Sequence, residues 1–170
     1  SLVKEDYGKI TYILNAKRRI VMKILICTDG SESSKKALEE AAVIAQGCNV
    51  EEAAVIHVHD PAIDTTFPFY ETISAEQMKN FEIMMEDQKK ERNKLLTKSA
   101  KFLKENNVKT KTILKEGHPS QTIVNVAKEE GFDMIILGSR GLGGLKKFFL
   151  GSVSNAVVQE AQNCSVLIVK

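Results

Sequence analysis

The order of elements along the chain constrains its fold more than any other feature of the sequence. Five short apolar runs alternate with stretches whose apolar residues recur every three or four positions. The expected strands are residues 22–28, 53–58, 108–114, 133–137 and 165–170, and the expected helices are residues 31–47, 74–106, 119–131 and 152–161. This β-α-β-α repeat predicts a three-layer α/β domain, an open parallel five-stranded sheet with helices on both faces.

Charge and cysteine content exclude several classes of protein. A formal net charge of +2 is too small to indicate binding to nucleic acid or to an anionic membrane. Three cysteines without a C-x-x-C pair argue against a disulfide framework or a zinc site and fit a reducing compartment. The apolar runs are too short to cross a bilayer, and the N-terminus lacks the apolar core of a signal peptide. We therefore expect a cytoplasmic protein.

Residues 1–21 precede the first apolar run. We expect them to form a disordered or non-native leader, which leaves residues 22–170 as a single domain. The loop between the second strand and the second helix contains Pro61 and Pro68, and we expect an irregular connection there.

Two loops fall at the edge of the predicted sheet where ligands bind in such folds. One is Asp29-Gly30, after the first strand, and the other is GSRGLGGLKKFFLGS, residues 138–152, after the fourth. The second loop matches neither the P-loop, since its Lys is missing, nor the dinucleotide fingerprint, since its third Gly is missing. Its glycines would still let backbone N–H groups approach an anion, and Gly151-Ser152 opens a helix with free N–H donors.

The spacing of this loop is G-x-x-G, nine residues, then G-S. It is formed by Gly138, Gly141, Gly151 and Ser152. Here the sequence resembles the ATP-binding branch of the universal stress protein family, whose signature is G-2x-G-9x-G-[ST]. The resemblance runs from about residue 22 to the C-terminus and includes Thr28-Asp29, His57-Val58, Gly117-x-Pro119 and the closing VLIVK. It implies a Rossmann-like fold of the adenine nucleotide alpha hydrolase type, with strand order 3-2-1-4-5.

The resemblance also implies roles for individual residues. Thr28 and Asp29 would belong to the nucleotide site, with Asp29 hydrogen-bonded to the ribose or to neighbouring nucleotide atoms. The backbone of Val58 would face the adenine edge, and Leu137 would pack near the base. Gly138 and Gly141 would let the chain pass close to the ribose and phosphates. The phosphates would be held by Gly151, Ser152, Val153 and Ser154, and Arg140 would screen their charge. Cys27 departs from the family pattern, in which many members carry Pro, and the extra pair Gly143-Gly144 loosens the loop.

Binding ATP does not by itself imply hydrolysis, which needs a positioned water, usually a metal, and a group that orients or deprotonates the water. Asp29 is the only acidic residue near the expected site, and the resemblance places it at the ribose. The chain is therefore interpreted as a nucleotide-dependent regulator or sensor in stress response that binds ATP or AMP, with Mg²⁺ as a phosphate counter-ion. A slow ATPase or phosphotransferase, an AMP sensor and a nucleotide-free interaction dimer remain as alternatives. The intact signature counts against the last.

Two further features concern partners and metals. The closing strand, residues 165–170, is apolar and would lie at the sheet edge, so we expect it to pair with its counterpart in a homodimer. His57 and His59 share one face of the second strand, but the sequence offers no third metal ligand. Both are interpreted as structural residues.

Overall fold

The computed structural model describes residues 21–61, 74–142, 150–162 and 164–170. Their five strands form one sheet in the order β3-β2-β1-β4-β5, in which every neighbouring pair is parallel. The strands are β1 (Met22–Cys27), β2 (Val50–His59), β3 (Thr110–Glu116), β4 (Met134–Gly138) and β5 (Ser165–Val169). The predicted fold class and strand order are confirmed.

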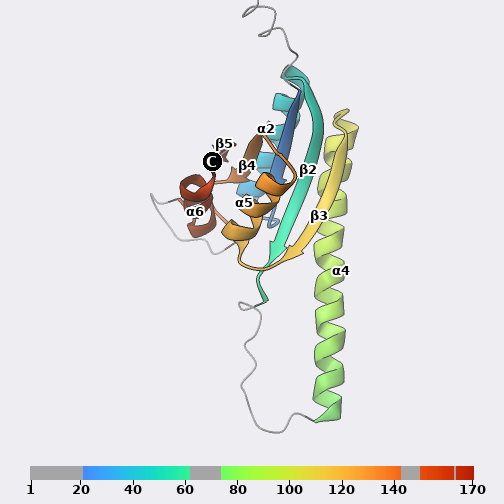
Figure 1. Ribbon diagram of the computed structural model, residues 1–170. Coiled ribbons are helices and arrows are strands. Elements are labelled where there is room, and N and C mark those ends of the chain that lie inside the picture. Colours follow the sequence, from blue (N-terminus) through green and yellow to red (C-terminus); the bar gives the residue numbers. More distant parts are fainter. Residues whose placement is uncertain (1–20, 62–73, 143–149, 163) are drawn as a thin grey trace, which may run out of the picture.

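Helices cover both faces of the sheet. α2 (Glu32–Gly47) and α4 (Ala75–Glu105) lie on one face, and α5 (Pro119–Glu129) and α6 (Ser152–Glu160) lie on the other (Figure 1). In β1, Ile24 and Ile26 point into the first core and Leu25 into the second, and all three are fully buried. A strand covered on both faces needs apolar residues at every position, which explains the continuous apolar run in the sequence.

The carboxyl ends of β1 and β4 form the switch point of the sheet. β1 leads into α2 on one face, whereas β4, its neighbour, leads toward α6 on the opposite face (Figure 1). Gly30 allows the turn after β1 because its φ is +84°, and Ser31 then caps α2 by accepting the Ser34 backbone N–H at 3.2 Å. Ligands of doubly wound sheets bind at this point.

α4 is much longer than the strands it covers. It begins with a capping box formed by Ser74 and Gln77. Its buried residues all lie in its C-terminal third, namely Leu96, Ser99, Ala100 and Leu103. The N-terminal half of the helix continues past the ends of β2 and β3 (Figure 1).

Some expectations fall outside the described residues. These are the proposed leader except for Val21, most of the Pro-containing connection, and the pair Gly143-Gly144. Within the described part of the chain, no helix is long and apolar enough to span a membrane.

Candidate functional site

The loops that follow β1 and β4 are joined by one carboxylate. Asp29 Oδ1 accepts the Ser31 backbone N–H at 2.9 Å, and Asp29 Oδ2 accepts the Leu142 backbone N–H at 3.1 Å. The first bond fixes the turn into α2, and the second holds the glycine loop against that turn. Asp29 therefore sets the relative position of the two loops.

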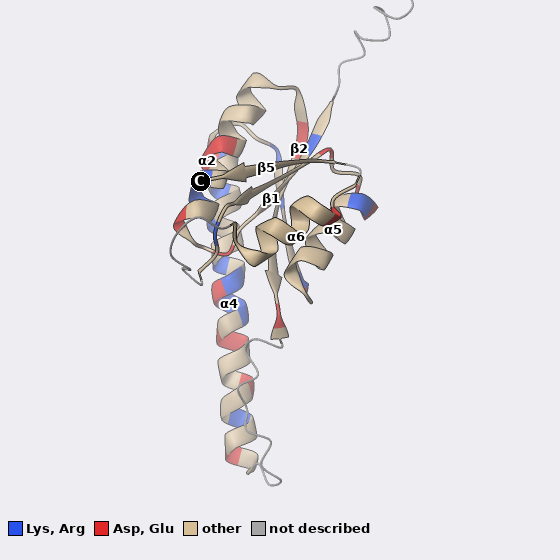
Figure 2. Cartoon of the chain, turned by 90° about the vertical axis from the view of Figure 1, so that its left-hand side faces the viewer, with Lys and Arg blue, Asp and Glu red and all other residues tan. Residues whose placement is uncertain are grey.

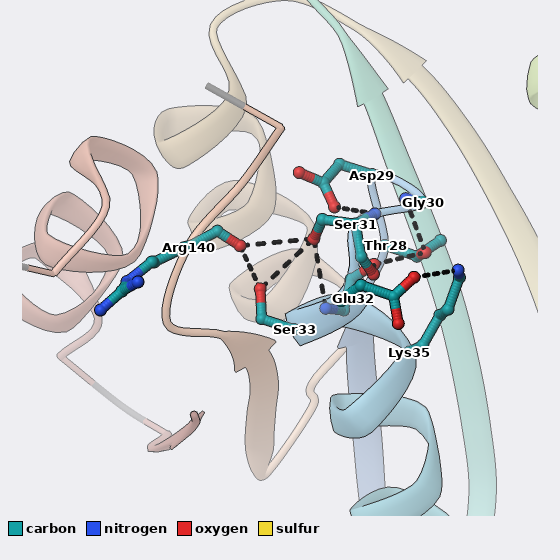
Figure 3. A network of polar contacts seen from close by, with 9 residues as sticks. Thr28, Asp29, Gly30, Ser31, Glu32, Ser33, Lys35 and Arg140 are labelled. Carbon is teal, nitrogen blue, oxygen red and sulfur yellow. Dashed lines mark hydrogen bonds and ion pairs between the residues drawn. The ribbon is translucent and has the colours of Figure 1, made fainter. Parts of the chain in front are cut away.

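Serines at the start of α2 bind the same loop through its backbone. The hydroxyls of Ser31, at 3.3 Å, and Ser33 both donate to the Arg140 carbonyl (Figure 3). The Arg140 side chain is exposed and points away from these serines (Figure 3). Arg140 is thus anchored by its backbone, and its guanidinium is available to solvent or to a bound anion.

The glycines of this loop lie where side chains would not fit. A Cβ on Gly138 would lie 2.6 Å from the Ser33 backbone carbon, and a Cβ on Gly141 would lie 2.8 Å from Asp29 Oδ2. Contacts under 3.0 Å do not occur for real Cβ atoms. At Gly138 the neighbour is backbone, so the end of β4 can pass closely over the start of α2 only because this position is glycine. At Gly141 the neighbour is the Asp29 carboxylate, which a side chain there would displace.

Gly151, at the other end of the glycine loop, bonds back to the start of the same loop. Its backbone N–H donates to the Ser139 carbonyl at 2.8 Å, and a Cβ there would approach that oxygen to 3.3 Å.

The N-terminus of α6 opens beside this loop. Gly151 is its N-cap residue, and no side chain caps the helix. The N–H groups of the first helical residues, which begin with Ser152 and Val153, therefore have no partner within the helix. Together with the helix dipole, they favour a negatively charged group at this position.

The two serines of α6 differ in their environment. Ser152 is exposed, so its hydroxyl can reach a ligand. Ser154 is buried, and its hydroxyl donates to the Gly138 carbonyl at 2.8 Å. In this arrangement the Ser154 hydroxyl ties α6 to the end of β4, and only its backbone N–H remains for an anion.

β2 contributes backbone groups above the end of β1. The Thr28 N–H donates to the Ile56 carbonyl and the Gly117 N–H donates to the His59 carbonyl, each at 2.9 Å. Because successive residues of a strand direct their backbone groups to alternate neighbours, Val58 directs its N–H and C=O toward the β1 side, where β1 has already ended. These groups therefore face the space beyond the end of β1.

Thr28 and Leu137 lie at the ends of β1 and β4, and both are buried. The Thr28 hydroxyl lies 3.3 Å from the Ser34 hydroxyl, and the Thr28 carbonyl accepts His57 Nδ1–H at 2.8 Å. His57 thus has the structural role expected from the sequence, since it holds the chain that leads to Asp29. Among the described residues, no group of three or more His, Cys, Asp or Glu is placed to hold a metal.

Cys27, the last residue of β1, lies directly beneath the site. Burial raises the pKa of the Cys27 thiol well above its usual range, and the nearby Asp29 carboxylate raises it further. The sulfur therefore stays protonated at neutral pH and acts as a small apolar group.

Sequence reasoning missed the contacts of Ser31 and Ser33 with Arg140. Ser31, Ser33 and Ser34 stand together at the start of the expected helix, but the sequence pattern alone indicates no part for them in the site. A helix N-cap uses one hydroxyl, and this stretch has three within four residues. The two additional hydroxyls are the signal that could have indicated a contact with another loop.

Comparison with known proteins identifies many relatives. The model of the universal stress protein family matches residues 21–170. Universal stress protein YxiE of Bacillus subtilis is 38% identical over 87% of this chain and 98% of its own length. Universal stress protein MJ0531 of Methanocaldococcus jannaschii is 34% identical over 94% of this chain and 90% of its own length.

Solved structures share the fold. Protein MJ0577 of Methanocaldococcus jannaschii superposes with a TM-score of 0.72 at 31% identity, covering 89% of this chain and 96% of the other. A universal stress protein in complex with cAMP gives a TM-score of 0.62 at 22% identity, covering 88% and 97% of the two chains. One from Archaeoglobus fulgidus in complex with dAMP gives a TM-score of 0.59 at 21% identity, covering 89% and 99%.

Proposed function

The chain belongs to the universal stress protein family, and we propose that it binds an adenine nucleotide, ATP or AMP, where the loops after β1 and β4 meet. The observation that carries this proposal is the uncapped N-terminus of α6 beside a loop closed by glycines. Backbone N–H groups and a helix dipole directed at one point form an anion site.

Each end of the nucleotide has its own partners in this proposal. The backbone N–H groups of Gly151, Ser152, Val153 and Ser154 and the exposed Ser152 hydroxyl bind phosphate, with the Arg140 guanidinium reaching the same charge. At the other end, the backbone of Val58 binds the adenine edge and Leu137 packs under the base. Asp29, held between Ser31 and Leu142, accepts from the ribose.

Two relatives of the same fold support an adenine nucleotide as the ligand class. Their structures contain cAMP and dAMP, which share an adenine, a pentose and one phosphate. ATP adds two phosphates, which the N-terminus of α6 and Arg140 would accommodate. Mg²⁺ would arrive with these phosphates, held by their oxygens rather than by a protein ligand set.

We propose a regulatory role in the cytoplasmic stress response rather than turnover. Both oxygens of Asp29 accept backbone N–H groups, so this carboxylate is fixed and is poorly placed to deprotonate a water. Occupancy of the site would instead change how the glycine loop rests on α2, and a partner would sense that change.

We further propose that two copies pair through β5. β5 lies at the sheet edge beside β4, and its apolar residues Val166, Leu167 and Ile168 are only half-buried. Since Ser165 and Val169 bond toward β4, the N–H groups of Val166 and Ile168 face the open edge. Ile168→Pro removes one such donor and should halve the mass in sedimentation if this edge pairs.

Titration calorimetry tests nucleotide binding. The wild type should bind ATP, and GTP at least tenfold more weakly, since the backbone of Val58 reads the base edge. Gly141→Ala places a Cβ against Asp29 Oδ2 and should weaken ATP binding. Gly131→Asn, far from both loops and at φ +68°, is the matched control and should bind normally. Absence of heat with ATP, ADP and AMP on the wild type would overturn the proposal.

A further inference from the structure

The N-terminal half of α4 projects from the domain with apolar residues uncovered. Met78, Ile83 and Met84 are 46%, 52% and 42% exposed, whereas the buried residues of the helix begin only at Leu96. Figures 1 and 2 both show this half running beyond the sheet. A helical segment of about fourteen residues is marginal in water without packing, so these side chains call for a partner surface.

A hollow lies along one side of this projecting half. It has a volume of about 630 Å³, and its lining includes Ile83, Met84 and Asp87. The lining combines Ile83 and Met84 with two carboxylates, Asp87 and Glu91, and one guanidinium, Arg92. Asp87 also accepts a hydrogen bond from Lys90 of its own helix at 3.0 Å. The carboxylates outnumber the guanidinium, so the hollow suits an aromatic or aliphatic side chain that arrives with a basic neighbour.

The other half of α4 presents such a pair. Phe102 is 36% exposed, and it follows Met84 by eighteen residues, which is about five helical turns. Phe102 and Met84 therefore lie on the same side of the helix. Lys98, one turn before Phe102, is exposed near the same side.

Charge along α4 is separated into two regions. Residues 75–88 contain four acidic residues and one Lys, whereas residues 89–105 contain seven basic and two acidic residues (Figure 2). Two such helices side by side repel each other when parallel, and they complement each other when antiparallel.

We propose that a second copy of this chain covers the Met84 side of the projecting half, by antiparallel pairing of the two α4 helices about a two-fold axis. Phe102 of each copy then enters the hollow beside Met84 of the other. The same register brings Asp87 of one copy within one residue of Lys98 of the other, and two-fold symmetry makes each contact twice. This interface is separate from the β5 edge and does not involve the loops after β1 and β4.

Charge reversal tests the pairing by sedimentation velocity on the full-length chain. Asp87→Lys and Lys98→Glu each replace two attractions by two repulsions, and each should weaken association roughly tenfold, so that the weight-average mass near the wild-type dissociation constant falls toward that of the species without this contact. The double variant Asp87→Lys/Lys98→Glu restores opposite charges across the axis and should regain the wild-type mass. The two residues are eleven positions apart in one helix, so this rescue cannot arise within one copy.

Substitution of two exposed apolar residues by Ser gives an independent test, again by the mass in sedimentation. Met84→Ser should lower the mass, whereas Val43→Ser, on α2 and 64% exposed, should leave it unchanged. A wild-type mass in both single charge variants, or a double variant that stays dissociated, overturns the proposal.

Discussion

Asp29 Oδ2 accepts the backbone N–H of Leu142 at 3.1 Å across 113 positions of the chain. This bond joins the loop after β1 to the loop after β4, and the second oxygen of the same carboxylate fixes the turn into α2. A single side chain thus controls the geometry of both loops, which makes it the most informative position to change.

Replacing Asp29 by Ala removes both hydrogen bonds and loosens the glycine loop, which the Ser31 and Ser33 hydroxyls still hold through the Arg140 carbonyl. Hydrogen bonds to a charged group contribute about 1.5–3 kcal/mol each. We expect ATP affinity, measured by calorimetry, to fall roughly 10- to 100-fold. Glu32→Gln serves as the control, because Glu32 is exposed and pairs with Lys35 on the surface. Equal affinities for both variants would show that Asp29 does not shape the site.

Gly138→Ala tests the close approach of β4 to α2. The added Cβ would lie 2.6 Å from the Ser33 backbone carbon, so the chain must shift at a cost of about 1–3 kcal/mol. At Gly47, near the end of α2, nothing lies within 4 Å of an added Cβ. Gly47→Ala should therefore be neutral or stabilising by up to about 1 kcal/mol. Urea unfolding of the two variants measures the difference, and similar midpoints would contradict it.

The two serines of α6 should separate stability from binding. Ser154→Ala removes a buried hydrogen bond to the Gly138 carbonyl and should lower the free energy of unfolding by about 1–3 kcal/mol. Ser152→Ala alters an exposed hydroxyl and should leave stability within about 0.5 kcal/mol while weakening phosphate binding. The reverse pattern would mean that Ser154, not Ser152, faces the ligand.

Thiol chemistry offers a test of the environment beneath the site. The pKa of Cys27 is raised mainly by burial and to a smaller extent by the nearby Asp29 carboxylate. The pKa of Cys164 is raised mainly by burial and to a smaller extent by Asp133. Because the thiolate is the reactive form, a disulfide reagent at pH 8 should modify the exposed Cys48 quickly and the other two slowly. All three should react at once in guanidinium. Rapid reaction of Cys27 in the folded protein, mapped by mass spectrometry, would contradict its burial.

The sheet could be predicted because its physical causes are local. Ile24, Leu25 and Ile26 are all fully buried on alternate faces, so the run itself reports a doubly covered strand. The bond from Ser33 to Arg140 could not be predicted in this way, since it exists only once the sheet order places β4 beside β1. Local sequence patterns do not reveal contacts between residues that are far apart in the chain.

Periodicity predicted α4 but not its projection. A helix rises about 1.5 Å per residue and a strand about 3.3 Å per residue. The 31 residues of α4 therefore form an element about twice as long as the seven residues of β3. The apolar stripe continues through Met78 and Met85 regardless of whether a sheet lies beneath them. The family resemblance implies that Ser154 helps to hold the phosphates, but no sequence pattern indicated that the Ser154 hydroxyl donates to the Gly138 carbonyl.

The most direct measurement is of the nucleotide itself. The purified protein is heat-denatured, the supernatant is analysed by ion-pair chromatography, and the melting temperature of nucleotide-free protein is followed with ATP and Mg²⁺. We predict about one adenine nucleotide per chain, or a melting temperature that rises with ATP and not with GTP, since a ligand that binds only the native state stabilises it. An empty protein whose melting temperature is unchanged by ATP, ADP and AMP would contradict nucleotide binding at the loops after β1 and β4.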